Sequence, residues 1–283
     1  MLKIGELGSG ENNEATGNVR AFWNSRAGLG QWAGTRDVIA KQIELAAIAG
    51  YVRDGMRILE VGCGNGITAI ELARSRKVTI LAIDYAAEMI VAAKALHDNQ
   101  QLTGSVRFQV GDVQSLAGLT EKFDLIYTER VLINLPDWPA QKKAIGDIAE
   151  LLTEGGIYVM CENSQDGLDE LNDLRARVDL PAIVAPWHNR YLRDRELEEI
   201  NVPGLRLVAI EYFSSTYYFL SRIVNASAAA RAGIEPDYDA PVNQLALTLP
   251  AIGKFGQGRI WLWRKTAASA VAATGGVAER AQG

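Results

Sequence analysis

The sequence is poor in cysteine, has no long hydrophobic run and lacks the apolar core of a signal peptide at its amino terminus. Its two cysteines, Cys63 and Cys161, cannot form a disulfide framework in 283 residues, so we expect reduced thiols that fill small apolar spaces. No apolar run reaches the roughly 18 residues that a membrane span needs. These absences predict a soluble, cytoplasmic protein with no membrane partner.

Basic residues are not in excess either. The chain carries 29 Lys and Arg against 34 Asp and Glu, a net charge of −5. A nucleic-acid-binding face needs clustered basic side chains to neutralise phosphates, so no nucleic-acid partner is expected. No cluster of Asp, Glu and His has the spacing of a metal site, and no metal is predicted.

The sequence does contain a glycine-rich turn between a predicted strand and a predicted helix. Residues 57–66 read Arg-Ile-Leu-Glu-Val-Gly-Cys-Gly-Asn-Gly, and helical spacing follows from Ile67. Glycine is used where the backbone takes φ > 0 or where a ligand must approach closely. A nucleotide-like ligand is therefore expected against this turn.

The spacing of the glycines discriminates between nucleotide ligands. A dinucleotide fingerprint, G-x-G-x-x-G, would place its last glycine at position 67, which is Ile67, and this disfavours a nicotinamide-dependent oxidoreductase. Asp84 closes a second apolar run about 20 residues after the turn, where an acid commonly accepts the hydrogen bonds of a ribose diol.

Five apolar runs alternate with helical patterns along the first part of the chain. Strands are predicted at 58–61, 78–83, 105–110, 123–128 and 157–161, with helices at 37–51, 67–73, 86–97 and from Asp137 to about 152. This alternation is typical of an α/β, doubly wound parallel sheet, whose ligands lie beyond the carboxyl ends of the strands.

The remainder of the chain is less regular. Helices are predicted around 167–178 and 193–200, strands at 205–211 and 215–220, and a last strand at 259–264. We expect a mobile arm at 1–18, one domain over 19–265 with a lid at 19–36 and an inserted helical cap at 221–256, and a disordered tail at 266–283.

Residues Glu60 to Gly66, together with Ile83-Asp84, closely resemble the first two motifs of the Rossmann-like (class I) S-adenosylmethionine-dependent methyltransferases. The resemblance covers roughly residues 37–162. It implies a mostly parallel seven-stranded sheet with an antiparallel last strand, and S-adenosylmethionine as cofactor, with S-adenosylhomocysteine as product. The cofactor contacts that it implies are Glu60, Gly62, Gly64, Gly66, Asp84, Tyr85, Met89, Asp112, Val113 and Glu129.

Within this set the roles differ. The glycines would lie against the methionine moiety and ribose, Asp84 would hold the ribose hydroxyls, and Asp112 with the backbone of Val113 would read the adenine, on which Tyr85 and Met89 would pack. The alternatives are that Asp112 only forms a turn and that Met89 is only core. In related enzymes an amino-terminal helix covers the cofactor, so Trp23 and Arg26 are expected to close the site. Alternatively, Trp23 only anchors the arm to the sheet.

Methyl transfer asks the protein to hold an acceptor in line with the methyl group, to exclude water and, where needed, to remove a proton. Polar residues follow the fourth and fifth predicted strands. Arg130, Asn134, Glu162, Asn163 and Trp187 are predicted to bind substrate. The alternatives are an ion pair between Glu129 and Arg130, and a helix cap formed by Asn163 and Ser164. His188 or Glu129 is predicted to act as general base, although a lone His beside Trp is often structural.

These residues look like those of methyltransferases that modify sugars or surface glycans, which implies O-methylation of a saccharide hydroxyl. An N-methyltransferase of a small amine and a non-catalytic methyltransferase-like subunit remain alternatives. A nucleic-acid methyltransferase is disfavoured, because Glu129-Arg130 stands where an Asn/Asp-Pro-Pro-Tyr/Phe motif would follow the fourth strand. A protein or lipid acceptor and a homodimer are left open.

Overall fold

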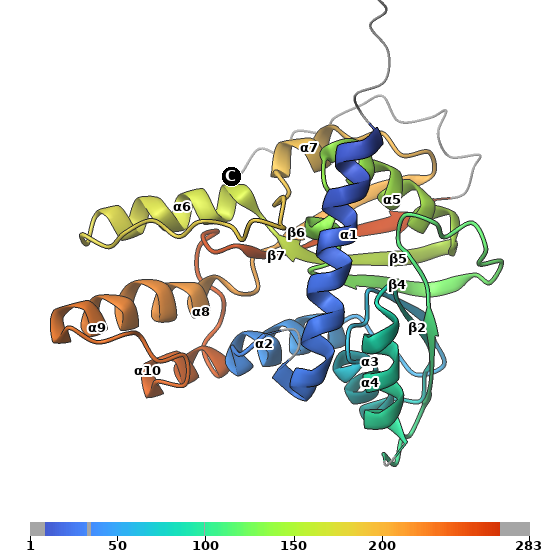
Figure 1. Ribbon diagram of the computed structural model, residues 1–283, viewed down its shortest axis with the longest axis horizontal. Helices are drawn as coiled ribbons and strands as arrows, with labels where there is room; N and C mark the ends of the chain where they lie inside the picture. Colours follow the sequence, from blue (N-terminus) through green and yellow to red (C-terminus); the bar gives the residue numbers. More distant parts are fainter. Residues whose placement is uncertain (1–8, 33–34, 99, 267–283) are drawn as a thin grey trace, which may run out of the picture.

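A seven-stranded sheet forms the centre of the molecule (Figure 1), in a computed structural model that describes residues 9–32, 35–98 and 100–266. The strand order is β3-β2-β1-β4-β5-β7-β6. The strands are β1 (Arg57–Val61), β2 (Thr79–Asp84), β3 (Ser105–Val110), β4 (Phe123–Glu129), β5 (Leu152–Asn163), β6 (Leu205–Glu211) and β7 (Gly258–Lys265). Among these strands, all pairs are parallel except the two that involve β7, which runs antiparallel to its neighbours β5 and β6. The predicted doubly wound sheet with an antiparallel last strand is confirmed.

Helices connect the strands and cover both faces of the sheet. They are α1 (Ser9–Arg26), α2 (Val38–Ala49), α3 (Ile67–Ser75), α4 (Ala87–His97), α5 (Trp138–Glu150), α6 (Gln165–Ala176), α7 (Asp194–Glu199), α8 (Ser215–Phe219), α9 (Ala226–Ala232) and α10 (Pro241–Gln244). Two predicted helix starts are confirmed by their caps. The Asp37 carboxylate accepts the Ala40 N–H at 3.0 Å, and the Asp137 carboxylate accepts the Ala140 N–H at 2.8 Å.

Alternate residues of the strands pack into two separate cores. Leu59 of β1 belongs to a core with Ile145 and Ile148 of α5. Its neighbour Ile58 belongs to another, with Ile48 of α2 and Ile70 of α3. Because successive strand side chains point to opposite faces, this division places α5 on one face and α2, α3 and α4 on the other. The helices on the two faces leave uncovered the loops that follow the carboxyl ends of the strands.

Two parts of the molecule lie outside this three-layer body. Figure 1 shows α1, in blue, standing across the direction of the strands. The same view shows α6, α8, α9 and α10 projecting together from one side of the sheet, and a π-helix at Leu220–Asn225 joins α8 to α9. Helices α9 and α10 and part of the π-helix fall within residues 221–256, where an inserted helical cap is predicted, and α1 overlaps the predicted lid at 19–36. No helix among the described residues is both long and apolar enough to cross a membrane.

The amino-terminal prediction was wrong in its extent. Helix α1 begins at Ser9, inside the segment expected to be a mobile arm. Extending a helix costs little once its first turn is fixed, and Val19 and Trp23 of the same helix are packed against the rest of the protein. Residues 1–8 and most of the predicted disordered tail, 267–283, lie outside the described residues.

A second correction concerns residues 215–220, which are helical rather than extended. The aromatic sequence favoured a strand, but Tyr217 and Tyr218 are adjacent and both buried in the same small core with Ile39 of α2. Neighbouring side chains of a strand would face opposite ways. Packing against α2 thus overrides the strand preference of these residues.

Candidate active site

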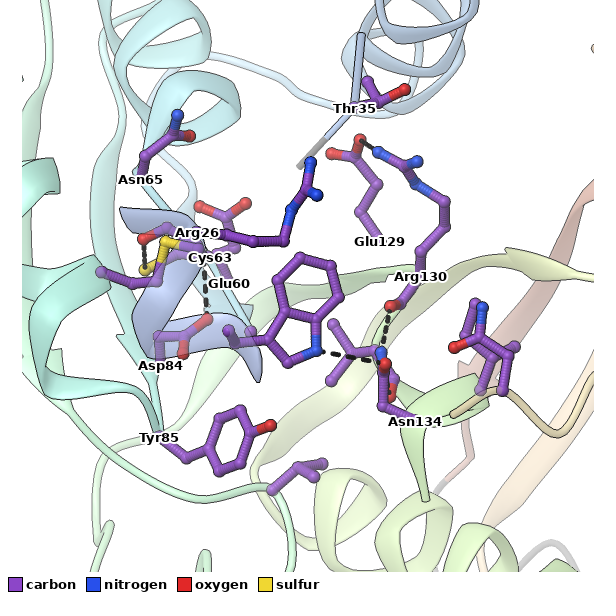
Figure 2. Close-up of a pocket in the computed structure, with 18 of the residues that line it drawn as sticks. Arg26, Thr35, Glu60, Cys63, Asn65, Asp84, Tyr85, Glu129, Arg130 and Asn134 are labelled. Atoms are coloured by element: carbon purple, nitrogen blue, oxygen red, sulfur yellow. Dashed lines mark hydrogen bonds and ion pairs between the residues drawn. The ribbon is translucent and has the colours of Figure 1, made fainter. Parts of the chain in front are cut away.

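A cavity of about 770 Å³ lies where β1, β2, β3 and β4 end, in the position predicted for the ligand. Helix α1 and the start of α2 close it on another side. Figure 2 shows how the labelled residues from the glycine turn, from β4 and from the amino-terminal segment face one another across it. Predicted residues that line the cavity are Trp23, Arg26, Glu60, Gly62, Gly64, Asp84, Tyr85, Met89, Asp112, Val113, Glu129, Arg130, Asn134, Asn163 and His188.

The glycine turn is tied to β2 by backbone and side-chain hydrogen bonds. The N–H groups of Gly62 and Cys63 donate to the Ile83 carbonyl, at 2.7 and 2.9 Å. One Asp84 carboxylate oxygen accepts the Gly64 N–H at 2.8 Å, and the other accepts the Ala86 N–H at 2.8 Å. Burial raises the pKa of Asp84, while these two N–H groups act to lower it.

Gly62, Gly64 and Gly66 of the turn all have positive φ, but their surroundings differ. A Cβ on Gly62 would lie 2.3 Å from a Val131 methyl carbon, whereas a Cβ on Gly64 would have no heavy atom within 4 Å. A Cβ on Gly66 would lie 2.5 Å from the Phe108 ring, and Gly66 does not line the cavity. The predicted cofactor contact of Gly66 therefore needs correction, because this glycine serves packing at the start of α3.

Another part of the cavity wall is formed by the residues after β2 and β3. Tyr85 and Met89 line it, and Met89 is also part of a small core with Trp23, so both interpretations of Met89 hold. The Asp112 carboxylate accepts the Gln114 N–H at 2.9 Å, as a turn residue would, and also an Arg20 N–H at 3.2 Å. Asp112 is thus both a turn residue and part of the cavity wall.

Helix α1 lines the cavity with Val19, Phe22, Trp23 and Arg26, and its side chains contact the surrounding loops. The Trp23 indole N–H donates to the Asn134 carbonyl oxygen at 3.3 Å, and the Arg20 guanidinium lies 5.1 Å from the centre of the Tyr85 ring. Arg26 lies inside the cavity in Figure 2. These contacts bridge α1 to loops after β2 and β4. In this structure α1 thus forms one wall of the cavity, in the segment where the sequence predicts a lid.

Glu60, the last acid before the glycine turn, is buried with an unpartnered oxygen. Among the described residues no group donates a hydrogen bond to its Oε2 atom. Burial, together with the charge of Glu129, raises the pKa of Glu60 to about 8. A cation bound beside Glu60 would lower this pKa again, so the position favours a positively charged ligand group.

Glu129 lies at the end of β4 with both carboxylate oxygens in use. One oxygen accepts a hydrogen bond from Lys41 Nζ of α2, and the other accepts one from the Thr68 hydroxyl of α3 at 2.8 Å. Burial alone would raise its pKa, but the charges of Lys41 and Arg130 lower it below the ordinary value. A weakly basic carboxylate with no free oxygen is a poor proton acceptor. The prediction of Glu129 as general base is therefore not supported, although the residue remains part of the cavity wall.

Arg130 has an unusual backbone, with φ of +57°. Strained backbone in folded proteins concentrates at functional sites. Its guanidinium lies 3.4 Å from Glu44 and 3.8 Å from Glu129, as the ion pair of the alternative interpretation requires. Its Nε atom is buried and has no hydrogen-bond partner among the described residues. Arg130 thus forms ion pairs with two carboxyl groups, while its Nε–H has no hydrogen-bond partner in the described part of the chain.

A family model described as a methyltransferase domain matches residues 52–198, which include the glycine turn, Asp84 and the end of β4. The chain belongs to this family. With the strand order given above, the match confirms the class I S-adenosylmethionine-dependent methyltransferase predicted from the two motifs.

Several proteins are similar to this methyltransferase. The malonyl-acyl-carrier-protein O-methyltransferase of Erwinia billingiae is 29% identical over 180 residues, which cover 63% of this chain and 62% of that protein. The chain therefore matches less than two thirds of this relative's length. A crystal structure of a 4+2 cyclase has 22% identity and a TM-score of 0.55, over 94% of this chain and 98% of that one. Magnesium protoporphyrin IX methyltransferase from Synechocystis, solved with bound S-adenosylhomocysteine, has 14% identity and a TM-score of 0.52, over 90% and 98%.

Two residues predicted to bind substrate in the methyltransferase lie outside its cavity. The Glu162 carboxylate accepts the N–H groups of Val131, Leu132 and Ile133, at 3.0, 3.1 and 3.4 Å, and so caps the short helix Leu132–Asn134. Trp187 is 70% exposed. Both predictions need correction, since one side chain is fully used by the backbone and the other faces solvent.

Replacing Glu162 with alanine should lower the free energy of unfolding by about 3 kcal/mol or more, because it leaves three N–H groups without their acceptor. Chemical denaturation measures this loss. Glu154→Ala, an exposed acid on the same strand, is the matched control and should change stability by less than about 0.5 kcal/mol. A Glu162→Ala protein as stable as the Glu154→Ala protein would contradict the capping role.

His188 lines the cavity beside the lid. Its ring centre lies 4.6 Å from that of Phe22 in α1, and its Nδ1 atom is buried without a hydrogen-bond partner among the described residues. Burial and the nearby Arg26 lower the pKa of His188 below 6.5. The imidazole is therefore neutral at pH 7, the state in which it can accept a proton.

Several polar cavity residues were not predicted from the sequence, among them Lys41, Tyr191 and Gln257. Lys41 reaches Glu129 from α2, and Tyr191 and Gln257 come from loops before α7 and β7. Lys41 belongs to the polar positions of an amphipathic helix and gave no signal of its own. The described residues contain no group of three or more His, Cys, Asp or Glu side chains that could hold a metal ion.

Proposed function

We propose that this protein transfers the methyl group of S-adenosylmethionine to a hydroxyl of a small acceptor, a sugar or glycan precursor. One observation carries the proposal. The glycine turn, Asp84 and His188 line the same cavity, so a cofactor and a proton acceptor can face the same substrate.

The residues of the cavity fit S-adenosylmethionine. The space above Gly64 accommodates a ligand that approaches the backbone, and Asp84 lies at the end of β2, where family members hold a ribose. The unpartnered Glu60 oxygen suits the ammonium group of the cofactor. When bound, the cofactor supplies a methyl group activated by its sulfonium. The chain's own task is to position the acceptor and to exclude water, which is the work of the α1 lid.

Amide and phenol side chains line the cavity away from the glycine turn. These side chains are Asn134, Asn163, Asn189, Tyr191 and Gln257. Amides donate and accept hydrogen bonds, which suits an acceptor that carries several hydroxyl groups. The relative from Erwinia billingiae is named an O-methyltransferase, and this supports oxygen as the accepting atom.

A hydroxyl acceptor must lose its proton as its oxygen attacks the methyl carbon. His188 is the residue for this step, because it lines the cavity and its ring is neutral at pH 7. The proton passes from the acceptor hydroxyl to the His188 imidazole. A small amine would need less help, since its lone pair can attack directly.

His188→Ala should lower kcat for a hydroxyl acceptor by about 100-fold to 10,000-fold and leave S-adenosylhomocysteine binding within about twofold. Transfer of a labelled methyl group from S-adenosylmethionine to a panel of sugars measures the rate, and calorimetry measures the binding. In the unmutated protein the rate should be full at pH 7 and fall as the pH drops through the lowered pKa of His188.

His97→Ala is the matched control, because His97 lies at the end of α4 against Phe108 and does not line the cavity. Its activity should equal that of the unmutated protein. Methyl transfer to amines that survives His188→Ala would favour the N-methyltransferase alternative. Binding of neither S-adenosylmethionine nor S-adenosylhomocysteine would instead favour a non-catalytic subunit.

A further inference from the structure

A second cavity, of about 290 Å³, adjoins the first between α2 and the helical cap. The two share Thr35, Arg130, Asn163 and Gln257 as walls, so they lie side by side. Arg130 thus lines both cavities. None of the residues of the turn lines it, and an acceptor is therefore its natural occupant.

The acidic side chains of the second cavity already have partners. One Asp37 oxygen accepts the Ala40 N–H and the Tyr217 hydroxyl, and the other accepts an Arg222 N–H at 2.9 Å. Glu44 lies 3.4 Å from Arg130. Burial raises the pKa of Glu44, so this carboxyl adds little negative charge at neutral pH. Asp37 is thus fully paired, whereas Glu44 has an ion pair with Arg130 but no hydrogen bond from any described residue to its Oε2 atom.

The basic side chains differ from the acids in this respect. Arg222 is held by Asp37, but Arg36 has no ion pair or hydrogen bond with any described residue, and Arg130 keeps an unpartnered, buried Nε–H. The cavity therefore combines three arginine side chains, two of which have donors to spare, with one fully paired acid, Asp37, and one acid of raised pKa, Glu44. Such an arrangement favours an anion, and the planar guanidinium matches a carboxylate in particular.

We infer that the second cavity binds a carboxylate group of the methyl acceptor, held by Arg36 and Arg130. The acceptor class is thus a hydroxylated carboxylic acid, such as a uronic acid. The inference rests on the proposed function, because it assigns the second cavity to the acceptor. An anchored carboxylate would leave the rest of the acceptor in the first cavity, where His188 can reach a hydroxyl.

The test compares matched acids and neutral compounds in the presence of S-adenosylhomocysteine. The probes are glucuronate against methyl glucoside and 4-hydroxybenzoate against 4-hydroxybenzamide, with binding measured by calorimetry. The unmutated protein should bind the acid of at least one pair about tenfold or more tightly than its neutral partner. Arg36→Gln should reduce this preference to about threefold or less, while S-adenosylhomocysteine still binds, since Arg36 does not line the first cavity.

Arg206→Gln, at an exposed arginine of β6, is the charge-matched control and should keep the full preference. Arg130→Lys retains the positive charge but loses the planar fork, so it should lose part of the preference without losing the fold. Equal binding within both pairs, including no binding of any probe, would overturn the inference. So would an unchanged preference in Arg36→Gln. Loss of S-adenosylhomocysteine binding in the unmutated protein would overturn the proposed function itself.

Discussion

Replacing Asp84 with alanine should weaken S-adenosylhomocysteine binding by about 100-fold or more. The carboxylate is expected to accept two hydrogen bonds from the ribose, and hydrogen bonds to a charged group contribute about 1.5 to 3 kcal/mol each. A loss of about 1.4 kcal/mol corresponds to a tenfold change in affinity. The same carboxylate also accepts the N–H groups of Gly64 and Ala86, so its removal frees the glycine turn as well.

Calorimetric titration of the unmutated and variant proteins measures this change. Asp173→Ala, at an exposed acid of α6, is the control for loss of one negative charge and should bind as the unmutated protein does. The S-adenosylhomocysteine affinity of Asp84→Asn should fall between those of the unmutated protein and Asp84→Ala, because the amide oxygen of asparagine still accepts one N–H. If Asp84→Ala binds S-adenosylhomocysteine within about threefold of the unmutated protein, the cavity holds the cofactor differently from the family.

The features predicted correctly from the sequence are those that depend on neighbours in the chain. The glycine turn, Asp84 and the Asp37 cap are each defined by residues within a few positions, and the structure places all of them as expected. Alternation of strands and helices then determines the sheet, because parallel strands need crossover helices.

The contacts that shape the site, in contrast, join distant parts of the chain. Lys41 meets Glu129 across 88 positions, and Tyr217 meets Asp37 across 180. No pattern of neighbouring residues in the sequence predicts such a pair. Glu129 therefore could not be recognised from the sequence as an occupied carboxylate, although its place at a strand end was correct.

Glu162 and Asn163 show a further limit of the sequence. They are adjacent in β5, and successive strand side chains point to opposite faces. A strand buried on both faces gives no alternation of polar and apolar residues to tell which face is which. Both residues were predicted to bind substrate, yet Asn163 lines the cavity while Glu162 binds the backbone after β4.

Gly62 and Gly64, the two glycines of the turn that line the cavity, should respond differently to replacement by alanine. Gly62→Ala should lower the free energy of unfolding by about 2 to 5 kcal/mol. Left-handed backbone costs a non-glycine residue about 1 to 2 kcal/mol, and the new Cβ would lie 2.3 Å from a Val131 methyl carbon, an overpacking that costs about 1 to 3 kcal/mol. Denaturant unfolding measures the loss.

Gly64→Ala should lose only the backbone part of that stability, about 1 to 2 kcal/mol, because no heavy atom lies within 4 Å of the new Cβ. That open space belongs to the cofactor cavity, so S-adenosylhomocysteine affinity should nevertheless fall by about tenfold or more. Adding Val131→Ala to Gly62→Ala removes the clashing methyls and should recover the steric part of the stability but not the backbone part. If Gly64→Ala instead binds the cofactor normally, the ligand does not approach this face of the turn, and the fit proposed for Glu60 and Asp84 fails with it.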